Sequence, residues 1–462
     1  MTAPEAFNPI PARDHRGFQR RRGLDAVTML TVYIALVCLV PSNLAISALG
    51  TLGRPSLLWG LFLALWWVTH NVQAHGRAVV PPPQPVRLAL AALIVVALVS
   101  FAVAVLRGQP ADQVTPAINA LIRFVSYGGV ALVAMDGIRT MRDLRTLVAR
   151  LVLLVGVVAL LGLVQTGTGM SIVDEISIPG FNRTEEGGIQ VRGSFVRAAG
   201  TAVHPLEYAT VLAICLPLAL AYAMVGEHSK RNGLFHLRLW LPLLVIASAT
   251  LVSASRSALL GFGVGLIAML PALPRRARGY TLLATAVLVA AVIVVFPGMF
   301  GTMMSMFTGV STEPSAISRT TGLARAPGFI AVSPLVGAGL GTFLPRYYIF
   351  DNQWVLLAVE IGLLGVLAFA SLLLTAMWSA WAARRASAEH DVLQFGQGLV
   401  AACLTAAVLM IGFDALSFPM SASILFLVIG LCGALRAVAD ADRWILASLP
   451  DSSPGGQARA AG

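Results

Sequence analysis

Apolar segments long enough to cross a lipid bilayer recur along the whole of this 462-residue chain. A spanning helix needs about 20 apolar residues, and the chain is 57% hydrophobic and only 11% charged. The sequence therefore predicts an all-α polytopic membrane protein with about twelve transmembrane helices. The predicted spans are 24–41, 55–70, 86–106, 117–135, 148–167, 205–226, 238–254, 257–273, 279–298, 353–380, 397–415 and 420–437.

The basic residues predict how these spans are oriented. If both termini are cytoplasmic, 22 of the 32 basic residues fall in the tails, in the connections on the cytoplasmic side or at the ends of the spans that adjoin them. Because Lys and Arg accumulate in cytoplasmic loops, this asymmetry supports an even number of spans in the plasma (inner) membrane with both ends inside. Residues 1–23 are then a disordered cytoplasmic tail, 24–437 the membrane domain, and 438–462 a second, partly disordered tail.

Two connections on the outer side are much longer than the rest, at 168–204 and 299–352. Loops of this size are usually either functional or disordered. Neither has low complexity, and both mix glycine, proline, aromatic and charged residues. We therefore expect two partly ordered extracytoplasmic loops that contain short helices.

A first group of polar residues lies where the first long loop meets the sixth predicted span. The stretch from Arg197 to Glu207 contains His204 followed by Pro205, a residue that suits the first turn of a helix because it lacks an N–H group. We expect Arg197, His204 and Glu207 to gather at the outer membrane boundary. The alternative is an interface arginine that snorkels to the headgroups beside a capping loop.

A second arginine, Arg256, lies in a tight turn between the seventh and eighth predicted spans, among the hydroxyls of Ser253, Ser255 and Ser257. Arginine is costly near hydrocarbon, and its planar fork suits phosphate and carboxylate oxygens. A bound anion is the natural partner for such a side chain. The alternative is a turn arginine that contacts a lipid headgroup phosphate.

The third group lies around the start of the tenth predicted span. Arg319 precedes the glycine-rich stretch 333–343, which is followed by Asp351 and then by Glu360 about two turns into the span. The stretch lacks the strand and βαβ context of a dinucleotide-binding fingerprint. Its glycines permit a tight turn or a close approach of backbone to a ligand. Glu360 has a plainer alternative role as a buried carboxylate paired with an arginine.

The order and membrane placement of these motifs resemble the O-antigen ligase and O-antigen polymerase family. The order is Arg-x-x-Gly and a proline before a span, Ser-x-Ser-Arg at a tight turn, then Arg followed by Pro-Leu-x-Gly-x-Gly-x-Gly-x-Phe. An asparagine that is followed, after seven residues, by Glu-x-Gly-x-x-Gly completes it. The resemblance covers 24–437, and the specific matches are concentrated in 192–365.

This resemblance implies a GT-C-like, metal-independent glycosyltransferase without a cofactor. Such enzymes move a glycan from a polyprenyl-diphosphate-linked donor to a glycan or lipid acceptor on the extracytoplasmic side, in cell-surface polysaccharide biosynthesis. By position, Arg197 and Arg256 match the family's diphosphate-binding arginines, and Arg319 matches a loop arginine. Membrane lipids are the other expected partners, whereas no basic stripe with interleaved aromatic residues indicates nucleic-acid binding.

One departure from the family pattern concerns the proton of the acceptor. Well-known O-antigen ligases have a histidine just before the asparagine of the tenth span, whereas this chain has Asp351 there. This difference favours a polymerase, or a ligase with another acceptor. The acceptor hydroxyl needs a base, and Asp351 is the first candidate, followed by Glu360, His204 and Glu207. Alternatively, Asp351 caps the helix of the tenth span.

Two other functions compete with glycan transfer. In a transporter or flippase for a lipid-linked sugar or a small anion, Arg123, Glu360 and Asp414 would line a path through the membrane. A carrier is expected to place such groups near the midplane, whereas the polar motifs of this chain concentrate on one side. A purely structural membrane subunit is the third possibility, against which the two long outer loops argue.

Overall fold

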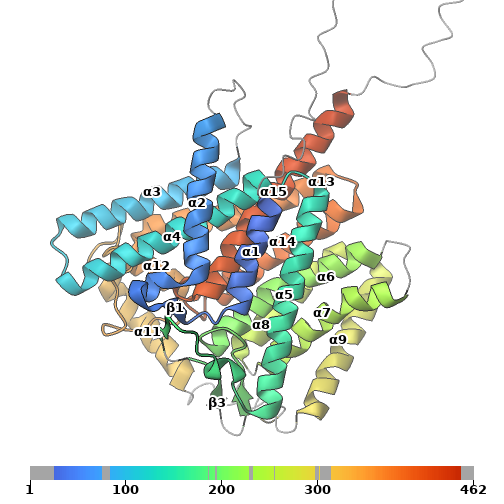
Figure 1. Ribbon diagram of the computed structural model, residues 1–462, viewed down its shortest axis with the longest axis horizontal. Helices are drawn as coiled ribbons and strands as arrows, with labels where there is room; N and C mark the ends of the chain where they lie inside the picture. Colours follow the sequence, from blue (N-terminus) through green and yellow to red (C-terminus); the bar gives the residue numbers. More distant parts are fainter. Residues whose placement is uncertain are drawn as a thin grey trace, which may run out of the picture.

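The structure, a computed structural model, describes residues 25–74, 84–185, 187–192, 195–227, 233–253, 255–296, 301 and 314–448. Within these ranges helices predominate, and short strands lie together at one end of the molecule (Figure 1). The predicted N-terminal tail and the last part of the predicted C-terminal tail fall outside the described residues. The last helix continues past residue 438, where the second tail was predicted to begin, and ends at Ser448.

Eight helices among the described residues are long and apolar enough to cross a membrane, so the chain is a multi-pass membrane protein. They are α3 (Pro85–Leu106), α4 (Ala111–Gly137), α5 (Met141–Thr168), α6 (Pro205–Glu227), α9 (Arg275–Val295), α13 (Gly362–Ala386), α14 (His390–Leu409) and α15 (Pro419–Ser448).

Four further apolar segments complete the helical core. The bent pair of η1 (Ser47–Gly53) and α2 (Pro55–Ala74) is long enough for another span if the two parts are counted together. The shorter segments are α1 (Ala26–Leu39), α7 (Gly233–Val252) and α8 (Arg256–Met269). Each predicted span coincides with one of these apolar segments or long helices, whereas the total number that crosses the membrane stays a prediction.

The connections between helices alternate between two ends of the molecule. At one end, where β1 and β3 lie in Figure 1, the connections that were predicted to be outer contact one another through Ser42 and Thr201, Asp112 and Arg346, and Arg319 and Gly412. We call this end the outer end, after that prediction. The C-terminal part of α15 lies at the opposite end (Figure 1). There the contacts join Gln84 to Gly433, His390 to Met224 and Arg384 to Pro271. This alternation is what the predicted topology requires.

The first long loop contains strands, which the all-α prediction did not include. Strand β1 (Leu44–Ile46) pairs antiparallel with β2 (Phe181–Arg183), and β3 (Gln190–Arg192) pairs with β4 (Phe195–Arg197). The only helical turn in the described part of this loop is the 3-10 segment η2 (Ile172–Glu175). The strands form because the backbone groups of the loop need partners. The connection after α1 supplies them for β2, and β3 and β4 supply them to each other.

The tenth predicted span, 353–380, is broken into α12 (Gln353–Glu360) and α13. The break lies at Gly362, whose φ is 70°, a left-handed conformation that favours glycine. The glycine-rich stretch passes beside the break, so that Gly339 N donates to Glu360 O at 2.8 Å and Leu363 N donates to Pro334 O at 2.9 Å. The glycines therefore allow one backbone segment to approach another closely, whereas an approach of backbone to a ligand stays a prediction.

Two smaller differences affect the outer end. Helix α14 ends at Leu409, so the predicted eleventh span, 397–415, ends too late, and residues 410–418 form a loop with the 3-10 turn η4 (Ala415–Ser417). We call this segment the 410–418 loop. In the second long loop, α11 (Pro314–Ile330) confirms the expectation of a short helix, whereas residues 302–313 lie outside the described residues.

Gly337→Ala should lower the unfolding temperature of the protein in detergent. A Cβ at this position would lie 2.2 Å from Glu360 O, and the φ of 74° costs a non-glycine residue about 1–2 kcal/mol before that clash is counted. Gly328→Ala in α11 is the matched control, because its Cβ meets nothing within 4 Å. Equal unfolding temperatures for both variants would show that the glycine run does not hold the break.

Candidate functional site

A cavity of about 360 Å³ lies between α8, α11, α12 and the end of α14. Three of the residues singled out from the sequence meet on its wall, although they come from three separate segments: Arg256, Arg319 and Asp351. The other lining residues are Ser257, Leu260, Gly322, Leu323, Phe350, Asn352, Val355, Val408, Leu409, Ile411 and Gly412. Two cations and one carboxylate therefore share an otherwise largely apolar chamber.

Arg256 is the first residue of α8, directly after the tight turn that the sequence predicted. Ser255 precedes the helix but its side chain does not cap it; its hydroxyl instead lies 2.8 Å from that of Ser257. The first N–H groups of a helix carry partial positive charge and have no partner within the helix. The cavity therefore meets an arginine and the positive end of α8 at the same place, an arrangement that suits an anion.

Arg319 comes from α11 in the second long loop. Its Nη2 donates to Gly412 O at 2.9 Å, which fixes the half-buried side chain against the 410–418 loop. Its Nε is buried and has no hydrogen-bond partner among the described residues. One edge of this guanidinium is thus held by backbone, and the group retains donor capacity.

Asp351 is half-buried at the bend before α12. Burial raises the pKa of its carboxyl, and the nearby Arg319 opposes that rise. The capping role considered for Asp351 is wrong, because Asn352 Oδ1 accepts hydrogen bonds from Trp354 N at 3.0 Å and Val355 N at 3.2 Å. The Asp351 carboxylate is therefore available for interactions other than capping.

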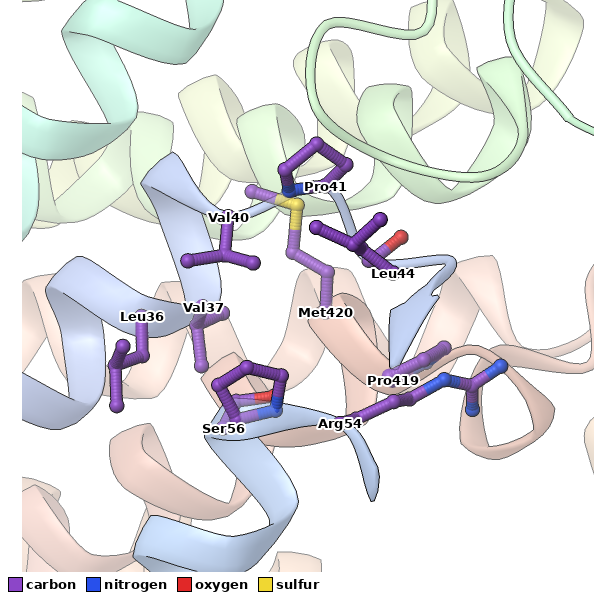
Figure 2. A pocket seen from close by; sticks show the side chains of 11 residues that line it. Leu36, Val37, Val40, Pro41, Leu44, Arg54, Ser56, Pro419 and Met420 are labelled. Atoms are coloured by element: carbon purple, nitrogen blue, oxygen red, sulfur yellow. The ribbon is translucent and has the colours of Figure 1, made fainter. Parts of the chain in front are cut away.

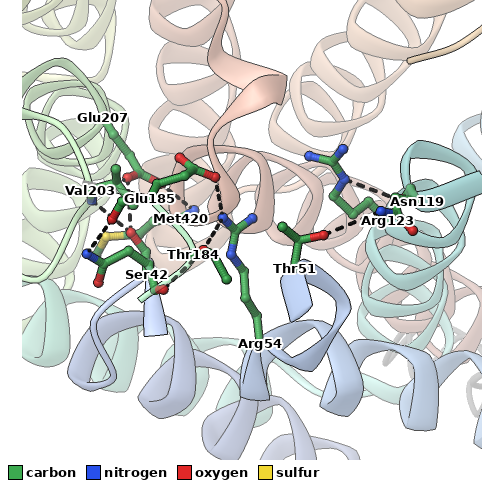
Figure 3. Close-up of polar contacts among 11 residues, drawn as sticks. Ser42, Thr51, Arg54, Asn119, Arg123, Thr184, Glu185, Val203, Glu207 and Met420 are labelled. Atoms are coloured by element: carbon green, nitrogen blue, oxygen red, sulfur yellow. Dashed lines mark hydrogen bonds and ion pairs between the residues drawn. The ribbon is translucent and has the colours of Figure 1, made fainter. Parts of the chain in front are cut away.

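Glu207, the last of the candidate bases, is fully buried in a network of hydrogen bonds (Figure 3). Its carboxylate accepts from Val203 N at 2.9 Å, Ser42 Oγ at 3.2 Å and Met420 N at 2.6 Å. These donors belong to the start of α6, the connection after α1 and the start of α15. Glu207 therefore ties three segments of the outer end together.

His204 immediately precedes α6 and acts as its cap. Its Nδ1 accepts a hydrogen bond from Leu206 N at 3.1 Å, and its ring centroid lies 5.9 Å from that of Phe418. Burial, and secondly the charge of Arg197, lower its pKa to about 4. A neutral imidazole whose Nδ1 accepts a hydrogen bond carries its proton on Nε2, so this ring presents a donor there.

His204→Asn should therefore keep activity close to that of the unchanged protein, because asparagine caps helices well. His204→Ala should lose about 1 kcal/mol of stability through the missing cap. Thermal unfolding and transfer rates of the two variants, measured between pH 5 and 8, check this. A large loss of rate in His204→Asn with normal folding would restore His204 as a candidate base.

The remaining two predicted site residues lie outside the lining of the cavity. Arg197 ends β4, is 8% exposed and lies close enough to His204 to affect its charge. The Glu360 carboxylate accepts the backbone N–H groups of Gly341 and Phe343, with Arg123 nearby. Glu360 thus holds the glycine-rich stretch against the end of α12 through backbone groups, and its pairing with an arginine stays a prediction.

Sequence reasoning missed Arg54, which is 4% exposed at the outer end. Its Nη2 donates to Glu185 Oε1 at 2.6 Å and Thr184 Oγ1 at 3.2 Å, so it fastens the first long loop to the start of α2 (Figure 3). A void of about 10 Å³, on whose wall Figure 2 shows Arg54 and Met420, has room for about one water molecule. The sequence feature that could have indicated Arg54 was its position directly before Pro55 in a connection predicted to be outer.

The 410–418 loop is the second feature that sequence reasoning missed. Its Gly412 accepts from Arg319 at the cavity, while its Phe418 contacts the His204 ring. Gln353 fastens the loop, since Gln353 N donates to Met410 O and Gln353 Oε1 accepts from Leu416 N, both at 2.8 Å. The loop therefore lies between the cavity and the group around His204 and Arg197.

A comparison with known protein families matches part of the chain. Residues 241–370 match the family model described as O-Antigen ligase. This region runs from α7 into α13 and includes Arg256, Arg319 and Asp351. No curated protein matches the chain. Among the described residues, no group of three or more His, Cys, Asp or Glu is placed to hold a metal ion.

Proposed function

We propose that this chain, which carries an O-antigen ligase family domain over residues 241–370, transfers a glycan from a polyprenyl-diphosphate-linked donor to an acceptor hydroxyl. Membership in this family supports glycan ligation or polymerisation in polysaccharide biosynthesis. The observation that carries the finer proposal is the meeting of Arg256, Arg319 and Asp351 in one cavity. The proposed reaction needs two cations and a base close together, and this cavity holds both.

The arginines would bind the leaving diphosphate. Negative charge develops on the diphosphate as the bond between the anomeric carbon and the phosphate oxygen breaks. Guanidinium groups form short, charge-assisted hydrogen bonds to phosphate oxygens and need no metal ion to do so. Because the remaining wall is largely apolar, these interactions are stronger than they would be in water.

Asp351 would accept the proton of the acceptor. The acceptor oxygen forms a new bond to the anomeric carbon, its proton passes to the Asp351 carboxylate, and the electron pair of the broken bond stays on the diphosphate. A carboxylate whose pKa is raised by burial is a stronger base than an exposed one. In this proposal His204 and Glu360 hold the surrounding segments in place, and Arg197 acts beside the cavity.

We further propose that the cavity faces the extracytoplasmic side and that both termini are cytoplasmic, in the plasma (inner) membrane. The excess of basic residues at the opposite connections supports this orientation. Labelling of an introduced cysteine tests it. Val191→Cys, at an exposed position in the first long loop, should react with an impermeant maleimide added to intact cells. Labelling only after the membrane is opened would invert the proposed orientation.

The central experiment is a transfer assay with the purified protein in proteoliposomes. Radiolabelled lipid-linked glycan, extracted from the strain that makes the polymer, is added with and without EDTA. Glycan transfer should release polyprenyl diphosphate at equal rates in both samples. A transporter or flippase would instead move the intact lipid-linked glycan between leaflets without cleaving it, and a structural subunit would do neither.

A further inference from the structure

The inner end of α13, opposite the cavity, carries two tryptophans with a guanidinium over each ring. The Arg385 guanidinium lies 4.5 Å from the Trp381 ring centroid, and the Arg436 guanidinium of α15 lies 4.9 Å from that of Trp378. We call these four residues the Trp-Arg cluster. A cation over an aromatic face is attracted to it, so both arginines are held at the surface of the helix bundle.

The cluster ends a continuous apolar stripe on α13. Leu367, Leu374, Trp378 and Trp381 are 65%, 62%, 47% and 40% exposed, and their spacing of seven, four and three residues places them on one face of the helix. In a membrane protein such a face lies against lipid chains. Tryptophan at the end of such a face is typical of the depth of the headgroups, because its amphipathic ring is favoured at the boundary between lipid chains and water.

The charges of the cluster are only partly neutralised by the protein. Arg436 Nε contacts Asp440 Oδ2 at 2.7 Å, so that cation has a carboxylate partner. Arg385 is exposed, and no carboxylate pairs with it among the described residues. The cluster of two arginines and one carboxylate thus retains a positive charge at headgroup depth, directly beside a surface for lipid chains.

We propose that the Trp-Arg cluster is a binding site for one anionic phospholipid. Its phosphate lies at Arg385 and Arg436, and its acyl chains run along the stripe of Leu367 and Leu374. The complementarity of charge at the headgroup and of apolar surface at the chains selects an anionic lipid over a zwitterionic one. Each arginine near a membrane surface contributes about a fivefold preference for anionic lipid. The site is independent of the glycan-transfer proposal.

Quenching of tryptophan fluorescence by brominated lipids tests this proposal on the full-length protein. The protein is placed in vesicles that contain either brominated phosphatidylglycerol or brominated phosphatidylcholine with the same chains. The signal of the two rings is the difference between the unchanged protein and Trp378→Phe/Trp381→Phe. Equal quenching of that difference signal should need a mole fraction of phosphatidylglycerol that is at least about fivefold lower than the mole fraction of phosphatidylcholine.

Arg385→Gln should reduce this preference by about fivefold while the protein folds normally, since the side chain is exposed. Arg276→Gln, at the exposed start of α9, is the matched control and should leave the preference unchanged. Excess inorganic phosphate should not compete, because it lacks the chains. Equal quenching by the two lipids, an equal effect of both variants, or competition by phosphate would each overturn the proposal.

Discussion

Asp351→Asn is expected to slow glycan transfer by about 10²–10⁴-fold while donor binding stays nearly unchanged. Asparagine has almost the same shape as aspartate but cannot accept the proton of the acceptor hydroxyl. Because Asn352 already caps α12, the substitution removes no cap and should not unfold the start of that helix. The measurement is single-turnover release of polyprenyl diphosphate by the purified variant in proteoliposomes.

The pH dependence of the rate provides a second test of Asp351. Only the ionised carboxylate is a base, so the rate should rise with pH as Asp351 loses its proton. Burial raises the pKa of this group, which places the rise above the pH of about 3.9 that an exposed aspartate would give. Asp112→Asn, which removes a partly exposed carboxylate elsewhere at the outer end, is the control. A normal rate for Asp351→Asn would transfer the role of base to Glu360 or His204.

Arg256→Lys and Arg319→Lys should each weaken donor binding and turnover by about 10- to 100-fold. Lysine keeps the charge but loses the planar fork, and one lost charge-assisted hydrogen bond is worth about 1.5–3 kcal/mol. Binding of farnesyl diphosphate, compared with farnesol, measures the diphosphate contribution directly. The effect should be present for the diphosphate and absent for the alcohol.

Arg325→Lys is the matched control for these substitutions. It lies on α11 six residues after Arg319, is exposed, and contacts the Tyr348 ring with its guanidinium 5.4 Å from the centroid, outside the lining of the cavity. It should bind farnesyl diphosphate like the unchanged protein. If all three variants lost affinity equally, the effect would be a general result of replacing arginine at this end of the molecule and would not indicate a diphosphate site at the cavity.

The helical segments and their alternation could be predicted from the sequence because apolar length is a local property of the chain. The tight turn before Arg256 and the start of α6 at Pro205 followed from local signals in the same way. The break at Gly362 could not, because it depends on backbone contacts with residues 334–339, which are distant along the chain. Strand β2 of the first long loop depends in the same way on a distant partner, β1 in the connection after α1, whereas β3 and β4 pair with each other within the loop.

The candidate site shows the same division. Arg256, Arg319 and Asp351 were found because charge is conspicuous in an apolar sequence. Their meeting with Gly412 was not predictable, since the apolar residues around that glycine read as a continuation of α14. Glu207 and His204 resembled catalytic groups for the same reason that Arg256 did. The structure adds that they accept hydrogen bonds from Met420 N and Leu206 N, contacts that the sequence did not indicate, whereas a catalytic role for either stays a prediction.

The hydrogen bond from Arg319 to Gly412 has a consequence for the synthesis of the protein. Arg256 and Arg319 leave the ribosome well before the carbonyl group and the residues of α14 that complete the cavity wall. During that interval the two arginines lie at the membrane without the chamber that later surrounds them. A chain that stops after α13 would therefore contain the whole region that matches the family model, residues 241–370, yet would lack Gly412 and the end of α14 that complete the cavity wall.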